Sequence, residues 1–116
     1  MNRIFFLLLM ILGSVTMEAQ NDYYIRQAKT YQREAEFYTK QADGYDREVQ
    51  YYNRQAQNHL REAEYYTKHN KYDQAMSYQR RAKDATNKAA SYQKKADDAR
   101  DKARSYLRKA EQALKK

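Results

Sequence analysis

A repeat of 14 residues runs through most of the sequence and limits what the chain can fold into. Three copies fill residues 23–64, starting with YYIRQAKTYQREAE, and a related set fills 78–116, starting with YQRRAKDATNKAAS. Fourteen residues are two heptads, the period of a coiled coil. The chain also has no proline and only two glycines, so little interrupts a long helix. We therefore expect an all-α protein.

Alanine and tyrosine make up the seam of the expected coiled coil. Position a of each heptad is alanine except at Val49, and position d of the first segment is tyrosine except at His59. In the second segment position d alternates between tyrosine and alanine, in the order Tyr78, Ala85, Tyr92, Ala99, Tyr106 and Ala113. The pattern predicts a long antiparallel two-helix coiled-coil hairpin with an Ala/Tyr seam.

The heptad phase changes between Tyr66 and Ala75, which predicts the turn of the hairpin. We expect a hairpin over 20–116, with helix one over about 22–68, the turn over about 69–73 and helix two over about 74–115. Asn70 is the expected left-handed residue, and Asp73 is the expected N-cap of helix two.

Two patterns predict the register of the helices. Tyrosines of one helix can face alanines of the other, as in the layers Tyr38–Ala103 and Ala35–Tyr106. Opposite charges can also meet across the hairpin, in the pairs Glu62–Arg81, Glu48–Lys95 and Glu34–Lys109, each contributing about 0.2–1 kcal/mol. Three layers, Ala56–Ala85, Ala42–Ala99 and Ala28–Ala113, place small residues together and leave space for another side chain.

A row of aromatic residues lies outside the seam of helix one and suggests an interaction face. Tyr23, Phe37, Tyr51 and Tyr65 occupy position c, beside a basic row that includes Arg33, Arg47, Arg54 and Arg61. This face can bind a ligand through stacking and charge. Alternatively, arginine stems cover the rings, or the row is buried against a second copy. We expect self-association or binding of another helical protein.

The charge of the chain is uneven. The sequence has a formal net charge of +8, but residues 22–68 carry 8 basic and 8 acidic residues, whereas 71–116 carry 14 basic and 6 acidic residues. This imbalance makes an anionic surface polymer the alternative partner: an anionic glycan, lipopolysaccharide or nucleic acid. Its candidate contacts are Lys95, Arg100, Lys102, Arg104, Arg108 and Lys109.

The first 19 residues read as a signal peptide. Arg3 precedes an apolar run over 4–12, and Ala19 offers a small residue for cleavage. The run is shorter than the roughly 20 residues of a membrane span. We expect export to the periplasm or secretion, with no stable membrane span after signal removal.

Catalytic chemistry has little support in the sequence. There is no cysteine, and the two histidines have no partners at the spacing of a metal site. Ser77, Ser91 and Ser105 recur at one repeat position, so the repeat explains them. We expect no enzymatic activity, no cofactor and no small-molecule substrate, and instead an exported structural or adaptor protein acting through coiled-coil association.

Two segments resemble known helical families. Residues 63–82, AEYYTKHNKYDQAMSYQRRA, resemble the inter-helix turn of a tetratricopeptide unit, with Asn70 where that family usually has its turn glycine. This resemblance implies a helix–turn–helix. The second helix is similar to the alanine-zipper helices of bacterial outer-membrane lipoproteins, which end in a lysine joined to the cell wall, as Lys116 ends this sequence.

Overall fold

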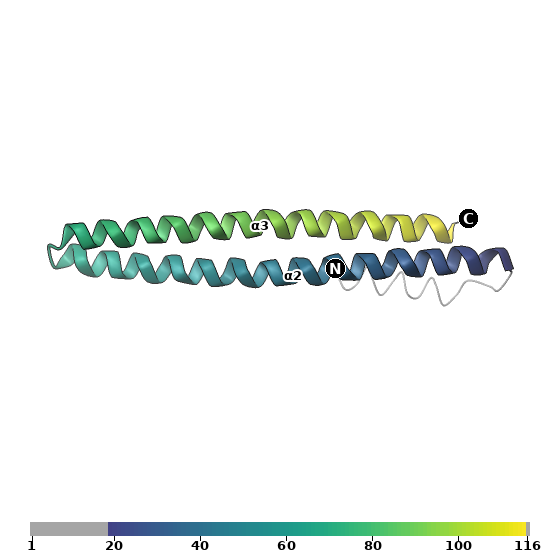
Figure 1. Cartoon of the computed structure of the whole chain (residues 1–116), viewed down its shortest axis with the longest axis horizontal. Coiled ribbons are helices and arrows are strands. Elements are labelled where there is room, and N and C mark those ends of the chain that lie inside the picture. Colours follow the sequence, from purple (N-terminus) through teal and green to yellow (C-terminus); the bar gives the residue numbers. More distant parts are fainter. Residues whose placement is uncertain (1–18, 116) are drawn as a thin grey trace. The chain divides into compact units, whose positions relative to one another are not determined.

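Two long helices and the turn between them make up the part of the chain that the structure describes. The computed structural model describes residues 19–115, with α2 over Ala19–Lys68 and α3 over Tyr72–Leu114 (Figure 1). The predicted all-α helical hairpin is confirmed. The expected signal peptide lies outside the described residues, apart from Ala19. Neither helix in the described range is long and apolar enough to cross a membrane.

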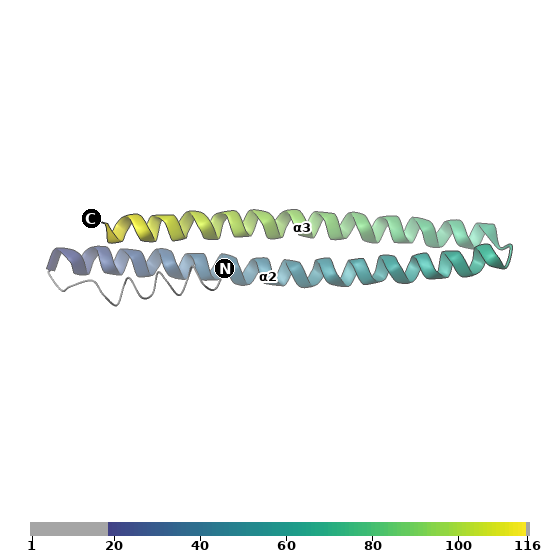
Figure 2. The ribbon, with the colours of Figure 1, turned by 180° about the vertical axis from the view of Figure 1, so that it is seen from behind.

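The paired helices divide into two compact units. One unit joins residues 19–40 to 99–115, and the other is Gln41–Asp98, which contains the turn. In the first unit Ala28 packs near Ala113, whereas Tyr38 contacts Tyr106. In the second unit, too, the α3 residues that contact α2 have lower sequence numbers as the sequence numbers of their α2 partners rise. Each unit is therefore an antiparallel helix pair (Figure 2).

Asn70 ends α2 in the left-handed conformation that the sequence predicts. Its φ is 61°, and it follows the last helical residue, Lys68, by two positions. The amide of Lys71 donates to the carbonyl of Tyr66 at 2.9 Å, and the amide of Asn70 donates to the carbonyl of Thr67 at 3.1 Å. These two hydrogen bonds define a Schellman motif, which satisfies carbonyls left free at a helix end.

The prediction that Asp73 is the N-cap of α3 is wrong. The carbonyl of Lys71 accepts the first helical hydrogen bond, from the amide of Ala75 at 3.0 Å, so Lys71 occupies the cap position. Asp73 instead lies in the first turn of the helix, where its negative carboxylate interacts favourably with the positive end of the helix dipole. The turn is shorter than expected because Lys71 serves both the end of α2 and the start of α3.

Alanine supplies the buried apolar core of both units. Among the described residues the buried apolar side chains all belong to alanine: Ala28, Ala35, Ala42, Ala56, Ala63, Ala75, Ala82, Ala85, Ala89, Ala96, Ala99, Ala103, Ala110 and Ala113. The seam tyrosines are only half-buried. Since apolar burial stabilises by about 25 cal/mol per Å², methyl groups alone give each unit a thin core.

The rings also confirm the predicted register. Tyr106 contacts both Tyr31 and Tyr38, as expected for a ring opposite Ala35, midway between them. Tyr92 contacts Tyr45 and Tyr52 in the same way. The large rings of one helix therefore lie between those of the other.

Candidate interaction face

The seam rings form three groups of the same design, each within one unit. In the second unit the ring centroid of Tyr92 lies 5.7 Å from that of Tyr52, with 9° between the ring planes, and 6.1 Å from that of Tyr45, with 37° between the planes. The other two groups are Tyr106 between Tyr38 and Tyr31, and Tyr78 between Tyr66 and His59. We call these the ring groups. Each stacks an α3 ring on one α2 ring and tilts it against another.

A further row of rings lies on α2, beside the ring groups. Each of these rings meets the following seam ring edge-on, in the pairs Tyr23–Tyr24, Phe37–Tyr38, Tyr51–Tyr52 and Tyr65–Tyr66, with centroids 5.0 to 5.2 Å apart. We call Tyr23, Phe37, Tyr51 and Tyr65 the outer rings. They remain 47% to 58% exposed. Each outer ring is thus held by its neighbour and remains partly exposed, and Tyr65 also packs against the ring of His69, with the centroids 4.2 Å apart.

Cations of α3 lie over the ring groups. The α3 cation row consists of Arg81, Lys88, Lys95, Lys102 and Lys109. Arg81 Cζ lies 4.7 Å from the ring centroid of Tyr78, and Lys95 Nζ lies 4.9 Å from that of Tyr92. The other three approach ring centroids at 4.9 to 6.0 Å. Each such contact contributes about 0.5–1 kcal/mol at an exposed site. The contacts of Lys88, Lys102 and Lys109 with Tyr52, Tyr38 and Tyr31 join α3 to α2, whereas the others lie within α3.

The ion pairs predicted between the helices are wrong. Within the described residues no ion pair joins Glu62 to Arg81, Glu48 to Lys95 or Glu34 to Lys109. The cations lie over tyrosine rings instead: Arg81, Lys95 and Lys109 over the tyrosine three residues earlier on α3, and Lys88 and Lys102 over tyrosines of α2. The three carboxylates remain exposed.

The residues predicted as an aromatic and basic face are only partly brought together. The outer rings share one row of α2 and contact the ring groups. Arg33, Arg47, Arg54 and Arg61 are exposed on the same helix, but none of them lies over a ring. Arg61 Nη1 instead lies 3.5 Å from Asn58 Oδ1.

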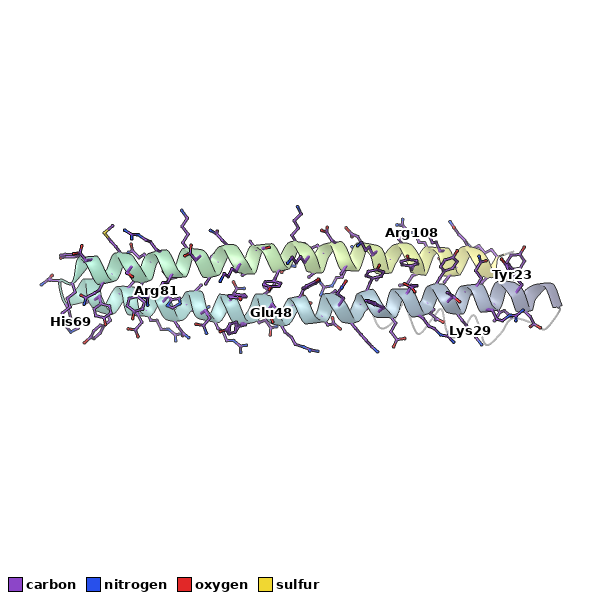
Figure 3. The ribbon with its side chains drawn as sticks, viewed as in Figure 1. Tyr23, Lys29, Glu48, His69, Arg81 and Arg108 are labelled. Carbon is purple, nitrogen blue, oxygen red and sulfur yellow. The ribbon has the colours of Figure 1, made fainter. Side chains whose placement is uncertain are left out.

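The residues predicted to contact a polyanion fall into separate sets. Lys95, Lys102 and Lys109 belong to the α3 cation row and lie over rings. Arg104 pairs with Asp101 on its own helix, and Arg100 is half-buried. Arg108 is exposed and points away from α2 (Figure 3). The six residues therefore differ in their contacts.

A hollow of about 270 Å³ opens beside Ala85 in the second unit. Its lining residues are Tyr51, Tyr52, Gln55, His59, Arg81, Asp84, Ala85 and Lys88. Ala85, at the base of the hollow, is itself buried, with 6% of its surface exposed. The alanine layers expected from the sequence leave space here, as predicted. The sequence did not lead us to expect cations on the rim of this hollow. The pattern that could have predicted them is the basic residue found three positions after each seam residue of α3.

The described residues contain no group of three or more His, Cys, Asp or Glu side chains that could hold a metal ion. His59 belongs to a ring group, and His69 lies at the turn with Nδ1 2.8 Å from the carbonyl oxygen of Tyr65. In each unit the surface that stands out is therefore the aromatic one, formed by its outer rings, its ring groups and its members of the α3 cation row. No protein family, no curated protein and no solved structure matches this chain.

Proposed function

We propose that the protein is a non-enzymatic structural or adaptor protein that acts through coiled-coil protein–protein association, with the outer rings as its contact surface. One observation carries the proposal. Large aromatic side chains, 47% to 58% exposed, recur on one row of α2, while the buried apolar side chains of the described residues are alanine alone. The chain thus presents its larger apolar groups to a partner instead of burying them.

The outer rings suit a protein partner because of their chemistry. Aromatic residues are enriched at protein interfaces, and a tyrosine adds a hydroxyl that can form a hydrogen bond at the edge of the contact. Each outer ring is braced by a seam ring, so little rotational freedom is lost on binding. A braced, exposed row of rings favours association with another helical surface.

Self-association is the form of the proposal that the thin core supports. A pair of helices with an alanine core buries little apolar surface for its length, and bundles of more helices bury more. A second copy carries the same outer rings, so a two-fold symmetric dimer buries the outer rings of both chains in one interface. Another helical protein with a similar face is the other partner of this class.

Export forms the second part of the proposal. The sequence of residues 1–19, with its basic start, apolar run and small residue at Ala19, supports a signal peptide and hence a periplasmic or secreted protein. Export would expose the aromatic face to partners outside the cytoplasm. Sequencing the amino terminus of the protein recovered from the exported fraction tests this part, and an intact Met1 there would contradict it.

Sedimentation equilibrium tests the association. Phe37, Tyr51 and Tyr65 are changed together to serine, and the expected result is a fall in mass from an oligomer to a single chain, with the helical circular dichroism retained. The matched control changes Gln50, Gln57 and Gln79, which are also exposed, to serine. An unchanged mass in the aromatic variant, or an equal fall in the control, would contradict the proposal.

A polyanion-binding module is the second candidate, favoured by the five cations in one row of α3. Retention on heparin should fall steeply with salt, because phosphate- or sulfate-type contacts release counterions. Changing Lys95, Lys102 and Lys109 to glutamine should reduce retention more than changing the exposed Arg80, Lys83 and Lys94. Absence of retention at low salt, or equal effects of the two sets, would contradict this candidate.

A further inference from the structure

The hollow beside Ala85 corresponds to a ring group without its α3 ring. Tyr52 and His59 line it from α2 and are seven residues apart, the same spacing as Tyr45 and Tyr52, which hold Tyr92 between them. Ala85 occupies the α3 position that is tyrosine seven residues earlier and later, at Tyr78 and Tyr92. The missing group is therefore one aromatic ring.

We propose that an aromatic ring from a second copy of this chain, one of its outer rings, fills this hollow. The inference rests on the proposed self-association and specifies where it occurs. The ring would stack between Tyr52 and His59, as Tyr92 stacks between its two neighbours. The hollow's volume of about 270 Å³ admits a phenol side chain.

The rim of the hollow carries charges that fit the surroundings of the outer rings. Arg81 and Lys88 line the hollow, each over a seam ring, with Lys88 Nζ 5.4 Å from the centroid of Tyr52. In the sequence a glutamate stands three residues before each of three outer rings, in the pairs Glu34–Phe37, Glu48–Tyr51 and Glu62–Tyr65. Residues three apart share a helix face, so each ring enters with a carboxylate beside it.

These glutamates are free to meet a partner. Glu34, Glu48 and Glu62 are exposed, and no ion pair engages them within the described part of the chain. The carboxylate of Asp84, also on the rim, can accept a hydrogen bond from a tyrosine hydroxyl, which favours Tyr51 and Tyr65 over Phe37 as the entering ring. The cations on the rim and the glutamates beside the outer rings have opposite charges, which favours a second copy of this chain as the partner that fills the hollow.

Filling the hollow from within the chain tests the inference. In Ala85→Tyr the new ring continues the tyrosine row of α3 and occupies the space, so we expect the dimer dissociation constant to rise by about tenfold or more. The control Ala90→Tyr adds the same ring at an exposed position of α3 and should leave the constant unchanged. If Ala85→Tyr dimerises like the wild type, the inference is overturned.

Charge reversal provides a test that does not alter the hollow's volume. Arg81→Glu with Lys88→Glu should weaken the dimer by about tenfold, and adding Glu48→Lys with Glu62→Lys should restore it. Both variants are followed by sedimentation, with helicity checked by circular dichroism. Weakening without restoration overturns the inference. If the outer-ring serine variant is monomeric while Ala85→Tyr and both charge variants dimerise normally, this inference fails and the proposed self-association stands. If the serine variant keeps the mass of the wild type, both the inference and the proposed function fail.

Discussion

Gln32 is a single residue that works against the stability of the hairpin. The residue is 5% exposed, and its Nε2 has no hydrogen-bond partner among the described residues. A buried donor without a partner costs about 1–3 kcal/mol. We predict that Gln32→Leu raises the free energy of unfolding by about 1 kcal/mol or more in urea denaturation. Gln57→Leu, at an exposed site, should change it little, and a loss of stability in Gln32→Leu would contradict the account.

Gly44 lies inside α2 without a conformational need for glycine. Its φ is not positive, and an added Cβ would meet no atom within 4 Å. Glycine in a helix interior costs about 0.8–1.0 kcal/mol relative to alanine. Gly44→Ala should therefore stabilise the protein by about 1 kcal/mol, seen as a higher midpoint in thermal unfolding. An unchanged or lower midpoint would show that Gly44 has a role not explained by its helix position.

At the scale of one element, Asn70 determines how α2 ends. A left-handed conformation costs about 1–2 kcal/mol for residues with a Cβ, is visited by asparagine more readily than by most, and costs glycine little. We predict that Asn70→Ala destabilises the protein by about 1 kcal/mol, whereas Asn70→Gly is tolerated. The Tyr72 hydroxyl loses its 3.0 Å hydrogen bond to Asn70 Oδ1 in both variants, so their difference isolates the backbone effect. Equal stabilities in urea would contradict it.

The α3 cation row offers a prediction about a single element. Lys95 lies over the ring of Tyr92, three residues before it on α3, so Lys95→Gln should cost about 0.5–1 kcal/mol, while Glu48→Gln should cost almost nothing. Both changes are made in the outer-ring serine variant, so that association does not contribute to the measured stability. Equal losses for the two changes would instead indicate an ion pair between them.

The heptad pattern was sufficient to predict the elements and their register. Alanine and tyrosine positions are tied to the helical period, and the position of the turn selects among registers that differ by one heptad. Asn70 was predictable because few residues other than glycine adopt its conformation.

Surface charges were not predictable in the same way. Lys95 could reach either Glu48 or the ring of Tyr92, and both contacts are worth less than about 1 kcal/mol. The pattern of charges therefore did not decide between them. The hollow beside Ala85 was foreseen as empty space, but its cationic rim depends on where Arg81 and Lys88 place their side chains.

For the whole molecule, the account links a thin core to association. The repeat places alanines in the buried core, half-buried seam tyrosines beside them, and the outer rings where they are exposed. A partner that covers those rings supplies burial that the hairpin lacks. The central claim is that this partner is a second copy, whose outer ring enters the hollow beside Ala85.

Cross-linking between two variants tests that claim most directly, since the chain has no native cysteine. One variant carries Ala85→Cys, and the other carries Phe37→Cys, Tyr51→Cys or Tyr65→Cys. The two are mixed and treated with a short thiol-reactive cross-linker. The account predicts a covalent dimer with Tyr51→Cys or Tyr65→Cys, and little product with the exposed control Ala90→Cys in place of Ala85→Cys. Equal yields with the control, or monomer alone in every mixture, would contradict it.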